Sequence, residues 1–305
     1  MVKIACLASI STIGANTGSP REVVEKNLRR AFNLVKEAVL DKPDVICLPE
    51  VFPTFGLSLK EAVEVAEPIP NTITETMGKI AKEHKTYIIC PMFIEEGGKI
   101  YNSAILIDRK GDIVDVYYKV HPTIGEIEVG VTPGRGAKVI ETDFGKIGIA
   151  ICFDLNFDDL FEEYRKSRVK VIFFPSAYPG GFQVPMRAYQ CACYFVTSIL
   201  EEGSMIVDPL GRILTKSSTY NPVISKRVNL DYEVLHLDYN FEKMKKIKEK
   251  YGPKIELNVS RPEGVFMLMS HTEEVSAMDV IKEFNMELRD EYFKRSSSKR
   301  IKALK

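Results

Sequence analysis

The sequence predicts an α/β fold built on a mixed sheet. Short apolar runs rich in β-branched residues recur along the chain, and segments of helical periodicity fill several of the gaps between them. Such alternation of strands and helices is typical of layered α/β proteins. Residues 102–107 and 112–118 flank the turn Arg109-Lys110-Gly111, which indicates an antiparallel hairpin within the sheet.

The strand-like runs are distributed over the whole chain. They are residues 2–8, 44–48, 86–93, 102–107, 112–118, 147–152, 170–175, 204–208 and 223–229. Each is short, apolar and bounded by turn-forming residues, which is the pattern expected of buried strands.

Four segments have the periodicity of helices. Residues 20–40 carry an apolar stripe and are opened by Ser19-Pro20, a good helix start. Residues 72–84 and 157–167 follow the same pattern, and residues 182–198 are predicted to form a largely buried helix.

The C-terminal region is predicted to be mostly helical. The last forty residues are charged and helical in pattern, and residues 267–269 precede them as a strand or packing segment. The final sequence KRSSSKRIKALK is expected to be a frayed, solvated tail.

Composition narrows the class of protein. The 305 residues are 45% hydrophobic and 28% charged, as in an ordinary globular protein. Lys plus Arg equals Asp plus Glu at 42 each, which argues against nucleic acid as the main partner. No apolar run approaches the roughly 18 residues of a membrane span, and the N-terminal run is interpreted as a core strand, not a signal peptide.

The cysteines indicate a reducing compartment. They lack the loop-rich surroundings of a disulfide framework and the paired spacing of a zinc site, so we expect a cytoplasmic protein. The positions are Cys6, Cys47, Cys90, Cys152, Cys191 and Cys193. Cys191 and Cys193 would face different sides of the predicted helix and are interpreted as core residues.

Polar residues follow several of the predicted strands at the point where each strand ends. Glu50 follows strand 44–48, Lys119 follows strand 112–118, and Cys152 ends strand 147–152. Ligands of layered α/β proteins bind at the carboxyl ends of the strands, so these side chains could converge on one site.

The chemistry of that trio is coherent. A thiol is a poor nucleophile until a base, a cation or a helix N-terminus activates it. Glu50 could take the proton from Cys152, and Lys119 could stabilise the thiolate and then an oxyanion. The Phe153 N–H, near a helix expected to start at Asn156, is a second candidate oxyanion donor. Taken singly, each residue has a simpler interpretation as a capping, solvated or core residue.

At these residues the sequence resembles the nitrilase, or carbon–nitrogen hydrolase, superfamily. The resemblance covers roughly residues 2–235. It rests on Leu48-Pro49-Glu50, Tyr118-Lys119-Val120-His121-Pro122, Gly148-Ile149-Ala150-Ile151-Cys152-Phe153-Asp154-Leu155-Asn156-Phe157, Val171-Ile172-Phe173-Phe174-Pro175-Ser176-Ala177 and Asp208-Pro209-Leu210-Gly211-Arg212.

The resemblance implies a fold and an activity. The fold would be a four-layer α-β-β-α sandwich over residues 1–270, with residues 271–305 as a C-terminal helical extension and tail. The activity would be hydrolysis of non-peptide carbon–nitrogen bonds through a thioester on the cysteine of a Glu50–Lys119–Cys152 triad. No metal or organic cofactor is implied, and the partners would be a small amide or nitrile and further copies of the chain in a homodimer or higher oligomer.

Alternatives to this activity stay open. The same site would suit nitrile or N-carbamoyl hydrolysis or acyl transfer, and a non-catalytic nitrilase-like binding protein is a further possibility. His121 could pair with the cysteine as in a Cys–His protease, but a structural hydrogen-bonding role is favoured.

The family also implies a second glutamate between the lysine and the cysteine. Glu126 lies seven residues after Lys119, as in the family's pattern, so it is preferred. On a local strand Glu128 would face the same side, so Glu128 remains the alternative.

Substrate recognition is less well specified. The candidate substrate-binding residues are Phe153, Asn156, Ser176, Ala177 and Tyr178. Asn156 stands where many small amidases of the family have an arginine, which weakens any inference of substrate by analogy. Residues 178–183 form either a pocket wall or a plain loop, and Arg187 and Tyr189 either reach substrate or pack.

Overall fold

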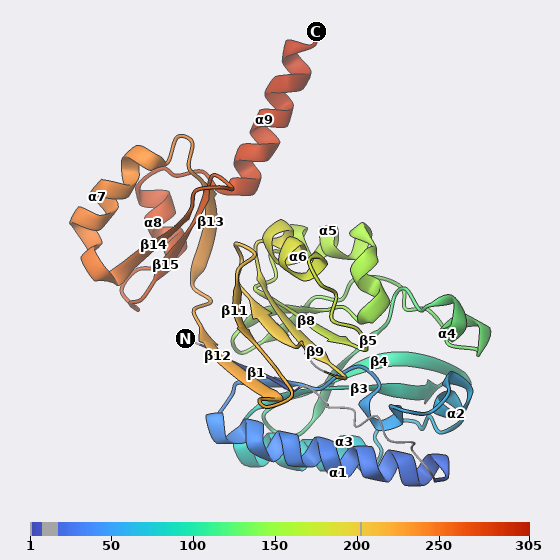
Figure 1. Cartoon of the computed structure of the whole chain (residues 1–305). Coiled ribbons are helices and arrows are strands. Elements are labelled where there is room, and N and C mark those ends of the chain that lie inside the picture. The colour runs from blue at the N-terminus through green and yellow to red at the C-terminus, as the bar shows by residue number, and fades with distance from the viewer. Residues whose placement is uncertain (1, 8–17, 202) are drawn as a thin grey trace. The chain divides into compact units, whose positions relative to one another are not determined.

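The computed structural model describes residues 2–7, 18–201 and 203–305, which form two compact units, Val2–Val228 and Asn229–Lys305 (Figure 1). The division expected from the sequence, between residues 270 and 271, falls inside the second unit. The reason is a three-stranded sheet in that unit, with order β13-β15-β14 and strands β13 (Tyr232–His236), β14 (Ile255–Ser260) and β15 (Val265–Ser270).

The first sheet of Val2–Val228 has six strands in the order β12-β1-β2-β3-β4-β5. Their bounds are β1 (Val2–Leu7), β2 (Val45–Cys47), β3 (Tyr87–Glu96), β4 (Lys99–Ile107), β5 (Ile113–Tyr118) and β12 (Val223–Val228). Strands β1, β2 and β3 are parallel, and β4 is antiparallel to both β3 and β5. Strand β5 therefore runs in the same direction as β2, and the predicted hairpin is confirmed.

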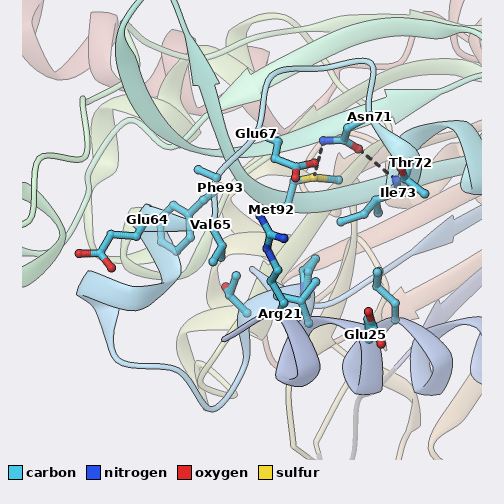
Figure 2. A pocket seen from close by; sticks show the side chains of 15 residues that line it. Arg21, Glu25, Glu64, Val65, Glu67, Asn71, Thr72, Ile73, Met92 and Phe93 are labelled. Atoms are coloured by element: carbon cyan, nitrogen blue, oxygen red, sulfur yellow. Dashed lines mark hydrogen bonds between the residues drawn. The ribbon is translucent and has the colours of Figure 1, made fainter. Parts of the chain in front are cut away.

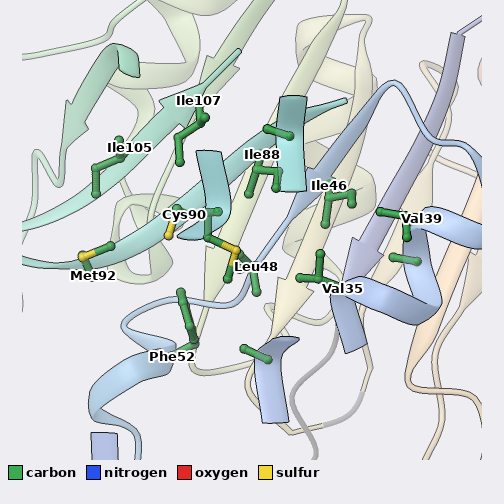
Figure 3. Close-up of a cluster of buried hydrophobic side chains, with 14 of the residues drawn as sticks. Val35, Val39, Ile46, Leu48, Phe52, Ile88, Cys90, Met92, Ile105 and Ile107 are labelled. Carbon is green, nitrogen blue, oxygen red and sulfur yellow. The ribbon is translucent and has the colours of Figure 1, made fainter. Parts of the chain in front are cut away.

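The helices α1 (Pro20–Ala38) and α3 (Thr72–His84) cover the outer face of this sheet (Figure 1). Alternate side chains of its strands, such as Ile46, Ile88 and Ile105, pack with Val35 of α1 in one buried cluster (Figure 3). Each such side chain contributes about 1.5–3 kcal/mol when it is fully buried. This packing fixes the end of β2, from which the chain continues to Glu50.

The second sheet has the order β11-β10-β9-β8-β7-β6. Its strands are β6 (Ile140–Thr142), β7 (Gly145–Ile149), β8 (Val171–Ser176), β9 (Tyr194–Ile199), β10 (Met205–Val207) and β11 (Ile213–Lys216). Helices α5 (Asp158–Lys166) and α6 (Gln183–Cys191) cover its outer face (Figure 1). The predicted four-layer α-β-β-α sandwich is confirmed.

Short helical segments complete this unit. They are α2 (Leu59–Glu64), α4 (Ile124–Glu128) and the 3₁₀ turns η1 (Val39–Asp41), η2 (Phe52–Thr54) and η3 (Cys152–Asn156). Two of them, α4 and η3, carry site residues.

The predicted helix over residues 182–198 is wrong beyond Cys191. Ala192 has a left-handed backbone, with φ of 52°, which ends α6, and β9 follows as a buried parallel neighbour of β8. A strand buried on both faces lacks polar alternation, so hydrophobic periodicity does not distinguish it from a buried helix. Cys191 and Cys193 are both buried but lie on different segments.

The unit Asn229–Lys305 also contains the helices α7 (Phe241–Tyr251), α8 (Ala277–Glu283) and α9 (Arg289–Ala303) and the turn η4 (Gly252–Lys254). The prediction of a C-terminal helical region is confirmed, but the prediction of a frayed tail is wrong, because α9 continues to Ala303. Within the described ranges, no helix is both long enough and apolar enough to cross a membrane.

Candidate active site

Glu50 lies just beyond the end of β2 and is almost fully buried, with 4% of its surface exposed. Its Oε1 accepts hydrogen bonds from Lys119 Nζ and Asn102 Nδ2, both at 2.9 Å, and its Oε2 accepts one from the Ala177 N–H at 2.9 Å. The next residue, Val51, has φ of 40°. A β-branched residue in this left-handed region costs about 1–3 kcal/mol, and such strain concentrates at functional sites.

Lys119 directly follows β5 and is also almost fully buried, with 1% exposed. Its Nζ lies 2.9 Å from Glu50 Oε1 and 2.8 Å from Glu126 Oε2. Burial by itself lowers the pKa of Lys119, but the negative charges around it, first of all Glu50, raise the pKa above its ordinary value. The side chain is therefore a permanent cation between two carboxylates.

The structure brings Glu126, and not Glu128, to this lysine. Both lie on α4, where residues two apart point about 200° away from each other, so the assumption of a local strand is wrong. Glu126 is buried and Glu128 is exposed. Burial tends to raise the pKa of Glu126, but Lys119 and hydrogen bonds from Asn102 and Thr123 outweigh it and hold the pKa below its usual range.

Asn102, on β4, is a site residue that motif reasoning misses. Its Nδ2 donates to Glu50 Oε1 at 2.9 Å and to Glu126 Oε1 at 2.7 Å, and its side chain is buried. The only signal in the sequence is a carboxamide at the first residue of the predicted strand 102–107.

Cys152 begins η3 just after β7 and has φ of 48°, a left-handed backbone at the corner between strand and helix. Its residue surface is 8% exposed. Burial, and then the negative charge of Glu50, raise the pKa of Cys152 to about 12, although Lys119 and the Ala177 N–H act in the opposite direction. The thiol is therefore protonated at neutral pH before substrate binds.

Asp154 connects this corner to the end of β5. Its buried carboxylate accepts hydrogen bonds from Tyr117 Oη at 2.7 Å, from the Ile151 N–H at 2.8 Å and from the His121 N–H at 2.8 Å. The His121 ring contacts Asp154 through Nδ1 at 3.2 Å and stacks on Phe157 at 3.8 Å. Hydrogen bonding to Asp154 raises the pKa of His121. These contacts support a structural role for His121.

The predicted substrate-binding residues surround the cysteine corner, and several hold one another. The Ser176 hydroxyl donates to the Tyr178 carbonyl at 2.7 Å, and Tyr178 Oη donates to the Cys152 carbonyl at 3.3 Å. Asn156 is exposed, and its Nδ2 donates to the Phe153 carbonyl at 3.1 Å. The Ala177 N–H donates to Glu50 Oε2, so Ala177 positions a side chain of the site through its backbone.

The loop that follows Tyr178 leads into α6, and Arg187 of that helix is buried. Its guanidinium donates to Asp158 Oδ1 at 2.5 Å and to the Leu155 carbonyl at 3.0 Å. Arg187 therefore ties α6 to η3 and the start of α5, which supports the packing interpretation.

A separate cavity of about 530 Å³ lies between the start of α1, the segment after α2 and the start of α3 (Figure 2). Its polar lining includes Arg21, Glu25, Glu64 and Glu67. The Asn71 side chain beside it caps α3 by accepting from the Ile73 and Thr74 N–H groups at 3.1 Å. The lining includes none of the residues of the cluster described above.

Known proteins of one family resemble this chain in sequence. A family model described as carbon–nitrogen hydrolase matches residues 10–233. The omega-amidase NIT2 of Xenopus tropicalis is 29% identical over 238 residues, covering 69% of this chain and 85% of that protein. The human deaminated glutathione amidase is 26% identical over 245 residues, covering 68% and 73%.

Solved structures give the same result for the fold. Nit3 of Saccharomyces cerevisiae, described as a member of branch 10 of the nitrilase superfamily, matches with a TM-score of 0.63 and 24% identity, covering 74% of this chain and 89% of that one. An amidase from Nesterenkonia sp. matches with a TM-score of 0.63 and 17% identity, covering 82% and 96%. Since the family model spans most of the sequence, the chain belongs to the carbon–nitrogen hydrolase family.

Proposed function

We propose that this carbon–nitrogen hydrolase cleaves small amides with Cys152 as nucleophile, Glu50 as general acid and base, and Lys119 as the cation that stabilises negative charge. The observation that carries the proposal is the buried cluster in which Lys119 Nζ bridges Glu50 and Glu126 beside the strained Cys152 corner. Nothing in the packing of the sandwich requires two carboxylates and an ammonium at this depth, because burying charges costs stability.

The acylation step follows from the charges of the cluster. With Lys119 positive and both glutamates ionised, the net charge is −1, so a free thiolate would add to an already negative site. The proton of the Cys152 thiol therefore passes to Glu50 as sulfur attacks the carbonyl carbon, and the total charge of the protein groups and the substrate stays at −1. The carbonyl electrons move to oxygen, where Lys119 and the Phe153 N–H stabilise the oxyanion.

The intermediate then collapses to a thioester. The carbon–nitrogen bond breaks, and the leaving ammonia or amine takes the proton from Glu50. Water next adds to the thioester while Glu50 accepts its proton. The carbon–sulfur bond breaks, the carboxylic acid leaves, and the Cys152 sulfur recovers a proton from Glu50.

The substrate class is proposed from the relatives. An omega-amidase and a deaminated glutathione amidase are among them, which favours an amide over a nitrile. Nitrile and N-carbamoyl hydrolysis are the second candidates, because the same triad would attack either carbon. Phe153, Asn156 and Tyr178 are proposed to line the substrate position near the cysteine.

A panel of small amides, nitriles and N-carbamoyl amines tests this function. Ammonia release identifies the substrate class, and mass spectrometry after rapid acid quenching detects an acyl group on the peptide that contains Cys152. Cys152→Ala, which should form no adduct, is the matched control. Turnover without any adduct on Cys152, or turnover by the alanine variant, would refute the triad.

We also propose a cytoplasmic location and a homodimer or higher oligomer. Cys47, Cys90, Cys152, Cys191 and Cys193 are free thiols, as is typical of proteins from reducing compartments. The oligomer is proposed from the family resemblance, and light scattering of the purified chain measures its size.

A further inference from the structure

Asn102 donates hydrogen bonds to both carboxylates of the site, Glu50 and Glu126, and so forms a second link between them beside Lys119. The two glutamates lie on different segments, Glu50 after β2 and Glu126 on α4, and the carboxamide of Asn102 lies against both. Lys119 bridges the same two carboxylates, so the four side chains form a closed ring of hydrogen bonds.

The backbone places Asn102 for this task. Ser103 pairs with Tyr118 in the antiparallel ladder of β4 and β5, so Asn102 lies opposite Lys119, whose N–H donates to the Asn102 carbonyl at 2.8 Å. One residue of β4 therefore positions both the main chain of the lysine and the carboxylates on either side of its ammonium.

The orientation of the carboxamide is fixed by charge. Turning the amide over would place Oδ1 against two carboxylate oxygens, where only a donor is tolerated. In the actual orientation Asn102 Oδ1 is buried, and no hydrogen-bond partner for it exists among the described residues. An unsatisfied buried acceptor costs about 1–3 kcal/mol. This cost argues that the residue serves the site more than the stability of the sheet.

We infer that Asn102 is a positioning residue, whose carboxamide clamps Glu50 and Glu126 around the Lys119 ammonium and so holds Glu50 in place for proton transfer with Cys152. The inference rests on the proposed function of the triad. Without the clamp, Glu50 keeps the lysine and the Ala177 N–H as partners, but its carboxylate is free to turn toward the ammonium.

Two substitutions of Asn102 and one control on the same strand test the clamp. Asn102→Ala removes both donors, and Asn102→Asp replaces them with a third carboxylate. Ser103→Ala is the matched control, because Ser103 is equally buried on β4 and its hydroxyl donates to the Met92 carbonyl at 2.8 Å, away from the glutamates. Circular dichroism and thermal unfolding report the fold of each variant, and Asn102→Ala carries the test if Asn102→Asp does not fold.

We expect kcat of Asn102→Ala to fall by about 10²-fold with KM changed less than about threefold, since the group acts on proton transfer and not on substrate binding. The acid limb of the kcat profile should move to higher pH by about one unit, because two buried carboxylates lose a donor that favours their ionised forms. Asn102→Asp should shift it further, through repulsion among three carboxylates. Ser103→Ala should keep the wild-type profile.

A second readout does not depend on turnover. The rate at which iodoacetamide alkylates Cys152, followed by peptide mass mapping, should fall in Asn102→Asp and stay near wild type in Ser103→Ala, because added negative charge disfavours the thiolate. If Asn102→Ala keeps wild-type kcat and acid limb, or if Ser103→Ala reproduces its losses, the positioning role is overturned. If the wild-type protein forms no acyl group on Cys152 from any of the panel, the proposed function fails instead, and the alkylation rates still decide the electrostatic coupling.

Discussion

Glu126→Gln is the substitution whose effect follows most directly from the contacts. The carboxylate accepts three hydrogen bonds, from Lys119 Nζ at 2.8 Å, from the Thr123 N–H at 2.7 Å and from Asn102 Nδ2 at 2.7 Å. Glutamine supplies only one oxygen, so its NH₂ group must face a donor whichever way it turns. A wrongly paired buried donor costs about 1–3 kcal/mol, and the loss of charge adds to this.

The loss of charge acts on Lys119. With Glu126 neutral, the ammonium keeps Glu50 as its one charged partner at 2.9 Å and attracts it more strongly, which makes Glu50 a weaker base. A weaker base or misplaced electrostatic group costs about 10²–10⁴-fold in kcat, which is about 3–5 kcal/mol of transition-state stabilisation at 1.36 kcal/mol per decade. The fold should survive, with the free energy of unfolding lower by about 1–3 kcal/mol.

The assay is ammonia release at saturating amide, with circular dichroism to check folding. Glu128→Gln is the matched control: it makes the same chemical change two residues away on an exposed side chain, so its kcat should stay within about twofold of wild type. A dead Glu128 variant beside an active Glu126 variant would reverse the assignment. Two active variants would show that the triad works without a second glutamate.

Three further outcomes are expected. Cys152→Ala should abolish turnover and Cys152→Ser should nearly do so, with thermal unfolding close to wild type for both; wild-type rates in either variant would exclude Cys152 as the nucleophile. Among the cysteines with described side chains, Cys152 should be alkylated fastest by iodoacetamide, because at 8% it is the most exposed of them, while Cys191 is 4% exposed and Cys47, Cys90 and Cys193 are 0% exposed; peptide mapping that found Cys191 or Cys193 labelled first would contradict the site. The pKa of Glu126 lies below its ordinary value of 4.5, so its ionised form stabilises the fold fully above that pH and less as pH falls through the folded-state pKa. The difference in unfolding temperature between wild type and Glu126→Gln should therefore shrink between about pH 7 and pH 3, and a constant difference would show that charge is not its cause.

Local patterns in the sequence predict much of the fold and the catalytic trio, because strand ends and turn residues are local features. The hairpin at Arg109-Lys110-Gly111 and the helices α1, α3 and α5 follow from periodicity and capping alone. Strand β9 does not, because a run buried on both faces has neither helical nor strand alternation. Asn102 does not either, because its role depends on where α4 places Glu126, which is a tertiary contact.

The choice between Glu126 and Glu128, in contrast, could have been made from a local signal in the sequence. Spacing from Lys119 favours Glu126, but the physical reason is local capping: Thr123 accepts from the Glu126 N–H at 3.2 Å, and Glu126 Oε2 accepts from the Thr123 N–H. Thr-x-x-Glu is a capping box that marks a helix start in sequence. Applying it to residues 123–126 would have replaced the assumed strand with a helix and separated the two glutamates.

The reacting groups come from two different sheets. Glu50 and Lys119 follow strands of the first sheet, while Cys152 and Ala177 follow strands of the second. Asp154 connects the two sheets. It lies two residues after Cys152, and its carboxylate accepts hydrogen bonds from Tyr117 Oη and the His121 N–H at the end of β5 in the first sheet. A displacement of about 1 Å between reacting groups can cost about 10²-fold in rate. The rate of hydrolysis therefore depends on how the two sheets are aligned. In mild denaturant we expect hydrolysis to be lost while each sheet still keeps its own hydrogen bonds.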